Sequence, residues 1–62
     1  MISESESYKV AYRFHGYALA SYYTNRPHDA IEQERNAVNT YPDEPFFHYW
    51  LSVFYLKAGR RN

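Results

Sequence analysis

Three prolines limit how long any regular element of this chain can be. Pro27 stands two residues after Asn25, a residue that favours helix ends, and Pro42 and Pro45 enclose an acidic dipeptide. Proline lacks the amide proton that a helix interior needs, but it fits the first turn of a new helix. The segments between these breaks carry apolar residues at helical spacing, which predicts an all-α chain. The predicted helices cover residues 8–24, 27–41 and 44–58.

Capping residues indicate where the first and third helices begin. Ser5 or Ser7 could cap the first helix, and Ser3 with Glu6 matches the capping-box pattern. Asp43 is the predicted N-cap of the third helix. The expected division of the chain is a flexible N-terminus over residues 1–7 and a single domain over residues 8–62.

The small size of the chain leaves little room for a stabilising core. A chain of 62 residues buries only roughly 60% of the surface that its unfolded form exposes. Domains of this size often depend on a disulfide, a metal or a partner. The sequence has no Cys, and three His without thiolates do not favour a structural zinc. We therefore expect no metal and no cofactor, and a protein partner is the remaining means of stabilisation.

Charge and targeting signals exclude several classes of protein. Basic and acidic residues balance at seven each, which disfavours nucleic-acid binding because that function needs a basic patch. The polar, acidic start is unlike a signal peptide, and no run of 18 apolar residues predicts a transmembrane segment. A cytoplasmic location is the default expectation.

Aromatic side chains are unusually abundant and are concentrated in the predicted third helix. Eight Tyr, four Phe and one Trp make up 21% of the chain. Nine of the eleven residues over 46–56 are apolar or aromatic. A helix that is apolar all round is normally buried on every side, yet two neighbouring helices can cover only part of it. The excess predicts an exposed apolar surface, since aromatic residues dominate protein interfaces as well as cores.

Residues 34 positions apart match in character between the first and third predicted helices. Matching pairs include Tyr12 with Phe46, Leu19 with Val53, and Asn25 with Gly59. A period of 34 is typical of a helix–turn–helix repeat. The chain resembles the tetratricopeptide repeat family over residues 11–61, as about one and a half degenerate repeats. The resemblance implies a helical hairpin followed by a third helix, which is a short α-solenoid.

Several positions fit the family pattern and others depart from it. Ala18, Ala30 and Ala37 stand where the family has small residues that let helices approach, and Pro42 stands at the repeat-terminal proline. Glu34 stands where the family has a large apolar residue. The departures, which also include Ser21 and His48, fit either a divergent repeat or a generic three-helix bundle with a coincidental offset. A buried Glu34 would need a partner such as His15, His48 or a tyrosine hydroxyl.

We interpret the chain as a non-enzymatic interaction module, an adaptor, assembly chaperone or regulator. The exposed apolar surface could meet a second copy of the chain, another protein or peptide, or a membrane surface, and we rank the homodimer first. By resemblance, ligands lie along the face made by the first helix of each repeat. The predicted contact residues are Tyr12, His15, Leu19, Tyr22, Tyr23, Phe46, Tyr49, Trp50, Val53, Phe54 and Leu56.

Catalytic patterns are missing from the sequence. Only His15, His28 and His48 could act as acid–base groups near neutral pH, and no nucleophile motif or phosphate-binding loop accompanies them. The alternative function is a small nucleic-acid-binding regulator of the helix-turn-helix type. The third predicted helix lacks the Arg, Asn, Gln and Lys of a recognition helix, which argues against that alternative.

Overall fold

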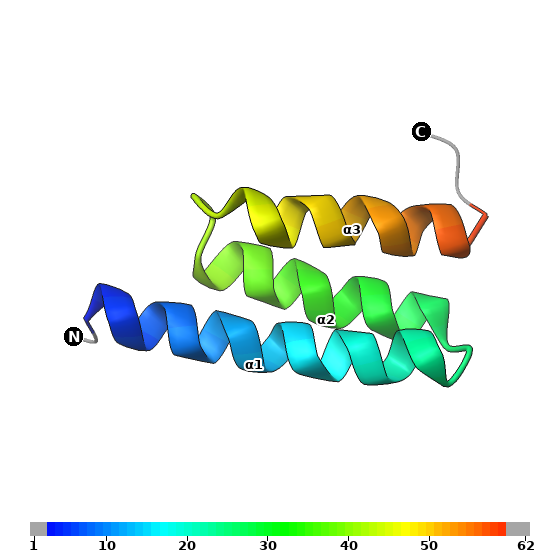
Figure 1. Ribbon diagram of the computed structural model, residues 1–62, viewed down its shortest axis with the longest axis horizontal. Helices are drawn as coiled ribbons and strands as arrows, with labels where there is room; N and C mark the ends of the chain where they lie inside the picture. Colours follow the sequence, from blue (N-terminus) through cyan, green and yellow to red (C-terminus); the bar gives the residue numbers. More distant parts are fainter. Residues whose placement is uncertain (1–2, 60–62) are drawn as a thin grey trace.

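The computed structural model describes residues 3–59, which form three α-helices (Figure 1). Helix α2 lies between α1 and α3 and runs antiparallel to both, so α1 and α3 run in the same direction (Figure 1). The backbones of α1 and α3 both pack against α2. The prediction of an all-α fold with three helices is confirmed. The helices are α1 at Glu4–Tyr23, α2 at Pro27–Thr40 and α3 at Pro45–Lys57.

Helix α1 begins one turn earlier than the predicted start at residue 8. Ser3 is its N-cap, and the Glu6 amide donates to Ser3 Oγ over 3.2 Å. The Ser3 amide in turn donates to Glu6 Oε1 over 3.3 Å. This capping box satisfies two amide groups that the helix leaves unpaired. Ser5 and Ser7 therefore lie inside α1 and do not cap it, and residues 1–2 of the predicted N-terminus are outside the described residues.

The connection between α1 and α2 contains a capping motif that ends α1. Asn25 has a φ of 65°, in the left-handed region that asparagine tolerates better than most residues. The Asn25 amide donates to the Tyr22 carbonyl over 3.2 Å, and the Arg26 amide donates to the Ser21 carbonyl over 2.8 Å. This pair of bonds is a Schellman motif. The prediction that α1 stops near Asn25 and α2 starts at Pro27 is confirmed.

The connection between α2 and α3 corrects the predicted cap. Glu44, and not Asp43, is the N-cap of α3, because its carboxylate accepts from the Phe46 amide over 3.2 Å. Pro45 then occupies the first helical turn, where its missing amide proton costs no hydrogen bond. The Nε2 atom of His48 lies 2.9 Å from the Pro42 carbonyl, so its N–H donates to this turn.

The core consists of two hydrophobic clusters with a polar layer between them. One cluster contains Ala11, Ala37 and Phe47, and the other is built around Ala18, Ala30, Ile31 and Phe54. On α1 and α2 the buried residues of successive layers are three or four positions apart, which is the spacing of one helical turn. His15 and Glu34 occupy the positions between the two clusters, and both side chains are buried.

Candidate functional site

The polar layer is a direct pair between α1 and α2. His15 Nδ1 lies 2.9 Å from Glu34 Oε1 and 3.1 Å from Oε2. An ionised carboxylate can only accept, so Nδ1 carries a proton whenever Glu34 is charged. The relative exposed surface is 1% for His15 and 0% for Glu34. The prediction that a buried Glu34 would be partnered is confirmed, with His15 as the partner and His48 bonded elsewhere.

Burial dominates the electrostatics of this pair. Desolvation raises the pKa of Glu34 above its ordinary value, while the hydrogen bond and the charge of His15 oppose that rise. The carboxylate is thus held in the core by one neighbour only. Glu34 departs from the repeat pattern, and His15 of the adjacent helix compensates for its burial by a hydrogen bond.

The predicted contact residues fall into three groups by exposure. Five are exposed, and their relative exposed surfaces range from 40% for Phe46 to 75% for Leu56. His15 and Phe54 are buried, so they support the surface from beneath. The remaining four are half-buried. The exposed residues are Tyr12, Tyr23, Phe46, Tyr49 and Leu56, and the half-buried ones are Leu19, Tyr22, Trp50 and Val53. We call these nine residues the aromatic face.

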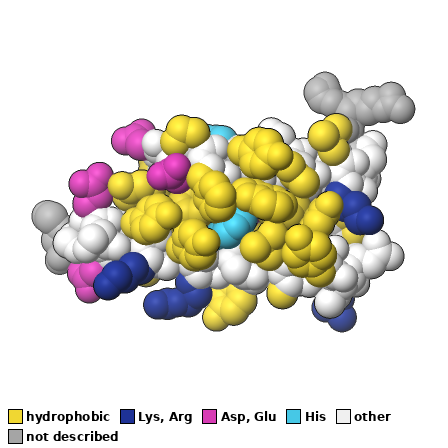
Figure 2. Space-filling view, in the orientation of Figure 1, with side chains coloured by type: hydrophobic (Ala, Val, Ile, Leu, Met, Phe, Trp, Pro, Cys, Tyr) yellow, Lys and Arg dark blue, Asp and Glu magenta, His cyan; other side chains and the backbone are white. Residues whose placement is uncertain are grey.

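The aromatic face spans α1 and α3 on the side shown in Figure 2, where hydrophobic side chains form a continuous field around one histidine. Lys, Arg, Asp and Glu side chains lie mainly around its edges (Figure 2). Of the thirteen aromatic residues in the chain, six are exposed and two are buried. The expectation that three short helices cannot enclose all the rings is confirmed.

Ring contacts join α1 and α3 across this face. Tyr12 and Phe46, which are 34 residues apart, lie with ring centroids 6.2 Å apart and an angle of 3° between their planes. The His15 ring contacts Phe46 at 5.0 Å and Trp50 at 5.6 Å. Tyr22 contacts Phe54 at 5.3 Å and lies under the Lys57 ammonium group at 5.9 Å. The side chains between the two parallel helices are therefore ordered before any partner binds.

Sequence reasoning missed one member of this surface. Tyr8 is 36% exposed, and its ring lies 5.9 Å from Tyr12 and 5.5 Å from Tyr41. The Tyr41 hydroxyl donates to Glu4 Oε2 over 3.1 Å, which raises the pKa of Tyr41 and ties α1 to the end of α2. The signal that could have found it is helical spacing, because Tyr8 lies four residues before Tyr12 and therefore on the same side of α1.

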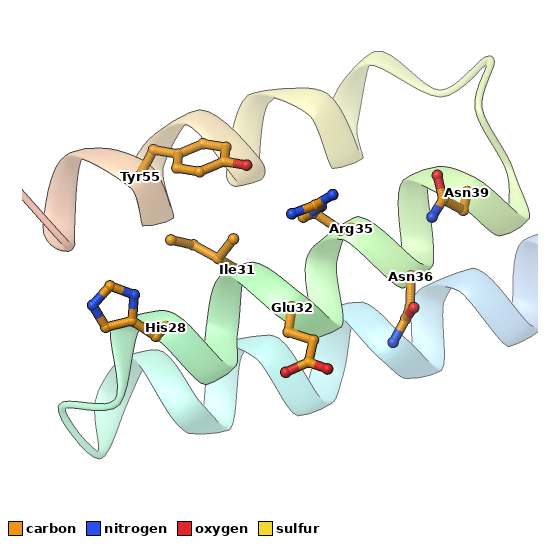
Figure 3. A pocket seen from close by; sticks show the side chains of 7 residues that line it. All are labelled: His28, Ile31, Glu32, Arg35, Asn36, Asn39 and Tyr55. Carbon is orange, nitrogen blue, oxygen red and sulfur yellow. The ribbon is translucent and has the colours of Figure 1, made fainter. Parts of the chain in front are cut away.

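A polar hollow of about 450 Å³ lies between α2 and α3 (Figure 3). Ile31 and Arg35 of α2 and Tyr55 of α3 lie in the gap between the helices (Figure 3). Its rim combines the acidic Glu32 with the basic Arg35, so it does not select one sign of charge. The aromatic face is the more distinctive of the two surfaces.

Residues 3–59 contain neither a candidate metal site nor a candidate membrane span. No three His, Cys, Asp or Glu side chains are grouped as metal ligands within that range. None of the three described helices combines the length and apolarity that a membrane span requires. Comparison with protein families, with curated proteins and with solved structures found no match to this chain.

Proposed function

We propose that this chain is a protein-interaction module that acts through the aromatic face and associates with a second copy of itself. The observation that carries the proposal is the exposure of Tyr12, Tyr23, Phe46, Tyr49 and Leu56. Helical spacing places these residues on one side of α1 and of α3, and the Tyr12–Phe46 ring contact joins the two sides. Monomeric proteins rarely expose large contiguous apolar patches, and such patches mark interaction sites. Aromatic residues are also the residues that contribute most often to interface hot spots.

The size of the face supports association between two copies. An aromatic side chain offers about 150–250 Å². With relative exposures of 40–75% for the five exposed members, one copy presents on the order of 500 Å² of apolar surface. Two copies would bury about 1,000 Å² from these residues alone, which reaches the lower limit for a specific interface. A formal net charge of zero adds no overall repulsion between copies.

The resemblance to tetratricopeptide repeats belongs to the same proposal. Ala18, Ala30 and Ala37 are all fully buried, as the family requires of the small residues at its helix contacts. The parallel α1 and α3 take the places of the first helices of successive repeats, and the aromatic face takes the place of the family's ligand-binding side. An adaptor, assembly chaperone or regulator in the cytoplasm would use such a surface without catalysis.

Two tyrosines of similar exposure allow a matched test. Tyr49 is 64% exposed on the aromatic face. Tyr17 is 57% exposed and lies about 200° around α1 from His15, on the opposite side of that helix. Tyr49→Glu should shift the mass measured by sedimentation equilibrium from twice 7.5 kDa to 7.5 kDa, while Tyr17→Glu should leave it unchanged. A wild-type chain that stays monomeric throughout the micromolar range would contradict self-association.

A further inference from the structure

One ring nitrogen of His15 has no partner within the described residues. Both hydrogen bonds of the imidazole involve Nδ1 and end at Glu34. No fully buried side-chain nitrogen or oxygen within residues 3–59 lacks a partner. Nε2 therefore reaches the surface, although only 2% of the His15 side chain is exposed. The pair thus presents a single polar atom at the bottom of an otherwise apolar surface.

The surroundings of Nε2 belong to the aromatic face. The His15 ring lies between Tyr12 at 5.5 Å, Phe46 at 5.0 Å and Trp50 at 5.6 Å. These ring contacts place the imidazole within the aromatic face. Glu34 fixes the imidazole from behind, in the manner by which a carboxylate sets the orientation of a functional histidine. The Nε2 atom of His15 therefore has a fixed orientation toward any group that binds here.

We infer that Nε2 of His15 is the polar anchor of self-association and binds the hydroxyl of a tyrosine from the aromatic face of a second copy. This inference rests on the proposed function and names the contact that aligns the two copies. It identifies His15 as a positioning and specificity residue within an apolar interface.

A tyrosine hydroxyl suits this atom whichever charge the pair carries. When His15 is neutral and Nδ1 donates to Glu34, Nε2 accepts a hydrogen bond. When the imidazole is protonated, Nε2 donates instead. A phenolic hydroxyl can donate in the first case and accept in the second. A lysine or a carboxylate would match only one of the two states.

The second copy carries such hydroxyls on the same face. Tyr12, Tyr23 and Tyr49 are exposed there, and none of their hydroxyls makes a hydrogen bond within residues 3–59. In a two-fold dimer the same patch meets itself, so donor and acceptor must both lie on one surface. The aromatic face meets that requirement without help from any other molecule.

The test combines removal of Nε2 with removal of single hydroxyls. The double variant His15→Leu with Glu34→Leu removes Nε2 without leaving a buried charge. Tyr12→Phe, Tyr23→Phe and Tyr49→Phe each remove one hydroxyl and keep the ring. The contact occurs twice in a two-fold dimer. The dimer dissociation constant should therefore rise about tenfold to a hundredfold in the double variant and in one of the three Phe variants, as the loss of two hydrogen bonds predicts. Combining those two changes should weaken the dimer no further.

The control and the contrary results separate this inference from the proposed function. Glu34→Gln keeps a polar partner for His15 and should leave the dissociation constant within about twofold of wild type. Circular dichroism checks that each variant is helical. If the dimer forms but a triple Tyr→Phe variant at positions 12, 23 and 49 binds as tightly as wild type, the polar anchor is wrong and the apolar interface stands. If Tyr17→Phe weakens the dimer equally, the anchor is also wrong. A monomeric wild type overturns both proposals.

Discussion

His15 and Glu34 form a buried, two-pronged contact in which one imidazole nitrogen lies within 2.9 and 3.1 Å of the two carboxylate oxygens. The two residues come from different helices and are 19 positions apart in the chain. Neither has another polar partner in the described core. Each side chain therefore depends on the other, because removing one leaves its partner buried without a polar contact.

Removing one member of this pair should be far more damaging than removing both. His15→Leu leaves the Glu34 carboxylate buried without a partner, which typically costs about 3–5 kcal/mol. The double variant with Glu34→Leu replaces the pair by apolar side chains and should be neutral or up to about 4 kcal/mol more stable. Urea unfolding followed by circular dichroism measures both. Equal destabilisation by the single and double variants would show that the pair is not coupled.

The pH dependence of stability should carry a component from Glu34. Its folded-state pKa lies above the ordinary value of 4.5, so the folded chain binds this proton more tightly than the unfolded chain does. The contribution is fully present below pH 4.5 and is lost as the pH rises through the folded-state pKa.

Relative to Glu34→Gln, the wild-type chain should therefore lose stability over that rise in pH. Urea unfolding at a series of pH values from 4 to neutral compares the two chains, and the other carboxylates cancel in the difference. The opposite trend, with the wild type gaining stability as the pH rises, would mean that the attraction of His15 outweighs the desolvation of Glu34.

The two glycines should respond in opposite ways to the same substitution. Gly16 is exposed in the middle of α1, and a Cβ there would meet nothing within 4 Å. Gly16→Ala should stabilise the chain by about 0.5–1 kcal/mol, which raises Tm by several degrees. Gly59 has the same free space but a φ of 79°, so Gly59→Ala should destabilise the chain. Thermal unfolding distinguishes them, and a lower Tm for Gly16→Ala would reveal a requirement for glycine that the monomer does not explain.

Alanine substitution of a core ring should lower the unfolding free energy far more than alanine substitution of a surface ring. Phe47 is fully buried between the helices, so Phe47→Ala should cost about 3–5 kcal/mol of unfolding free energy. Tyr49, two residues later, is mostly exposed, and Tyr49→Ala should change stability by less than about 1 kcal/mol when measured on the monomer. Chemical unfolding at low protein concentration gives both values. A large loss for Tyr49→Ala would assign that ring to the core and weaken the case for the aromatic face.

The helix limits were predictable because proline and asparagine act locally. Pro27 and Asn25 define the first turn through φ restrictions that neighbouring helices do not alter, and the same holds for Pro45. The start of α1 was misplaced because a capping box of short polar residues gives a weak pattern, although its hydrogen bonds form at Ser3. Glu44 and not Asp43 is the cap because α3 begins at Pro45, so Glu44 is the residue directly before the first helical turn, and its carboxylate accepts from the Phe46 amide.

The candidate site was predictable in part. The excess of rings over interior volume follows from counting, but counting does not say which rings are exposed. Of the predicted contact residues on α3, Phe46 and Tyr49 are exposed whereas Phe54 is buried. Which polar group meets Glu34 depends on how α1 and α3 are rotated about their axes against α2, and this rotation is set by packing between the helices. The sequence alone therefore left His15, His48 and a tyrosine hydroxyl as equal choices.

The polar layer between the two hydrophobic clusters also has a consequence for alignment. Alanines lie one turn away on either side of His15, at Ala11 and Ala18, so apolar packing by itself would tolerate sliding α1 along α2 by about 5.4 Å. Such a slide would place the Glu34 carboxylate against an alanine methyl group and leave it buried without a polar partner. The His15–Glu34 pair therefore favours one alignment of α1 along α2, where the buried alanines of the two helices would pack similarly in more than one position.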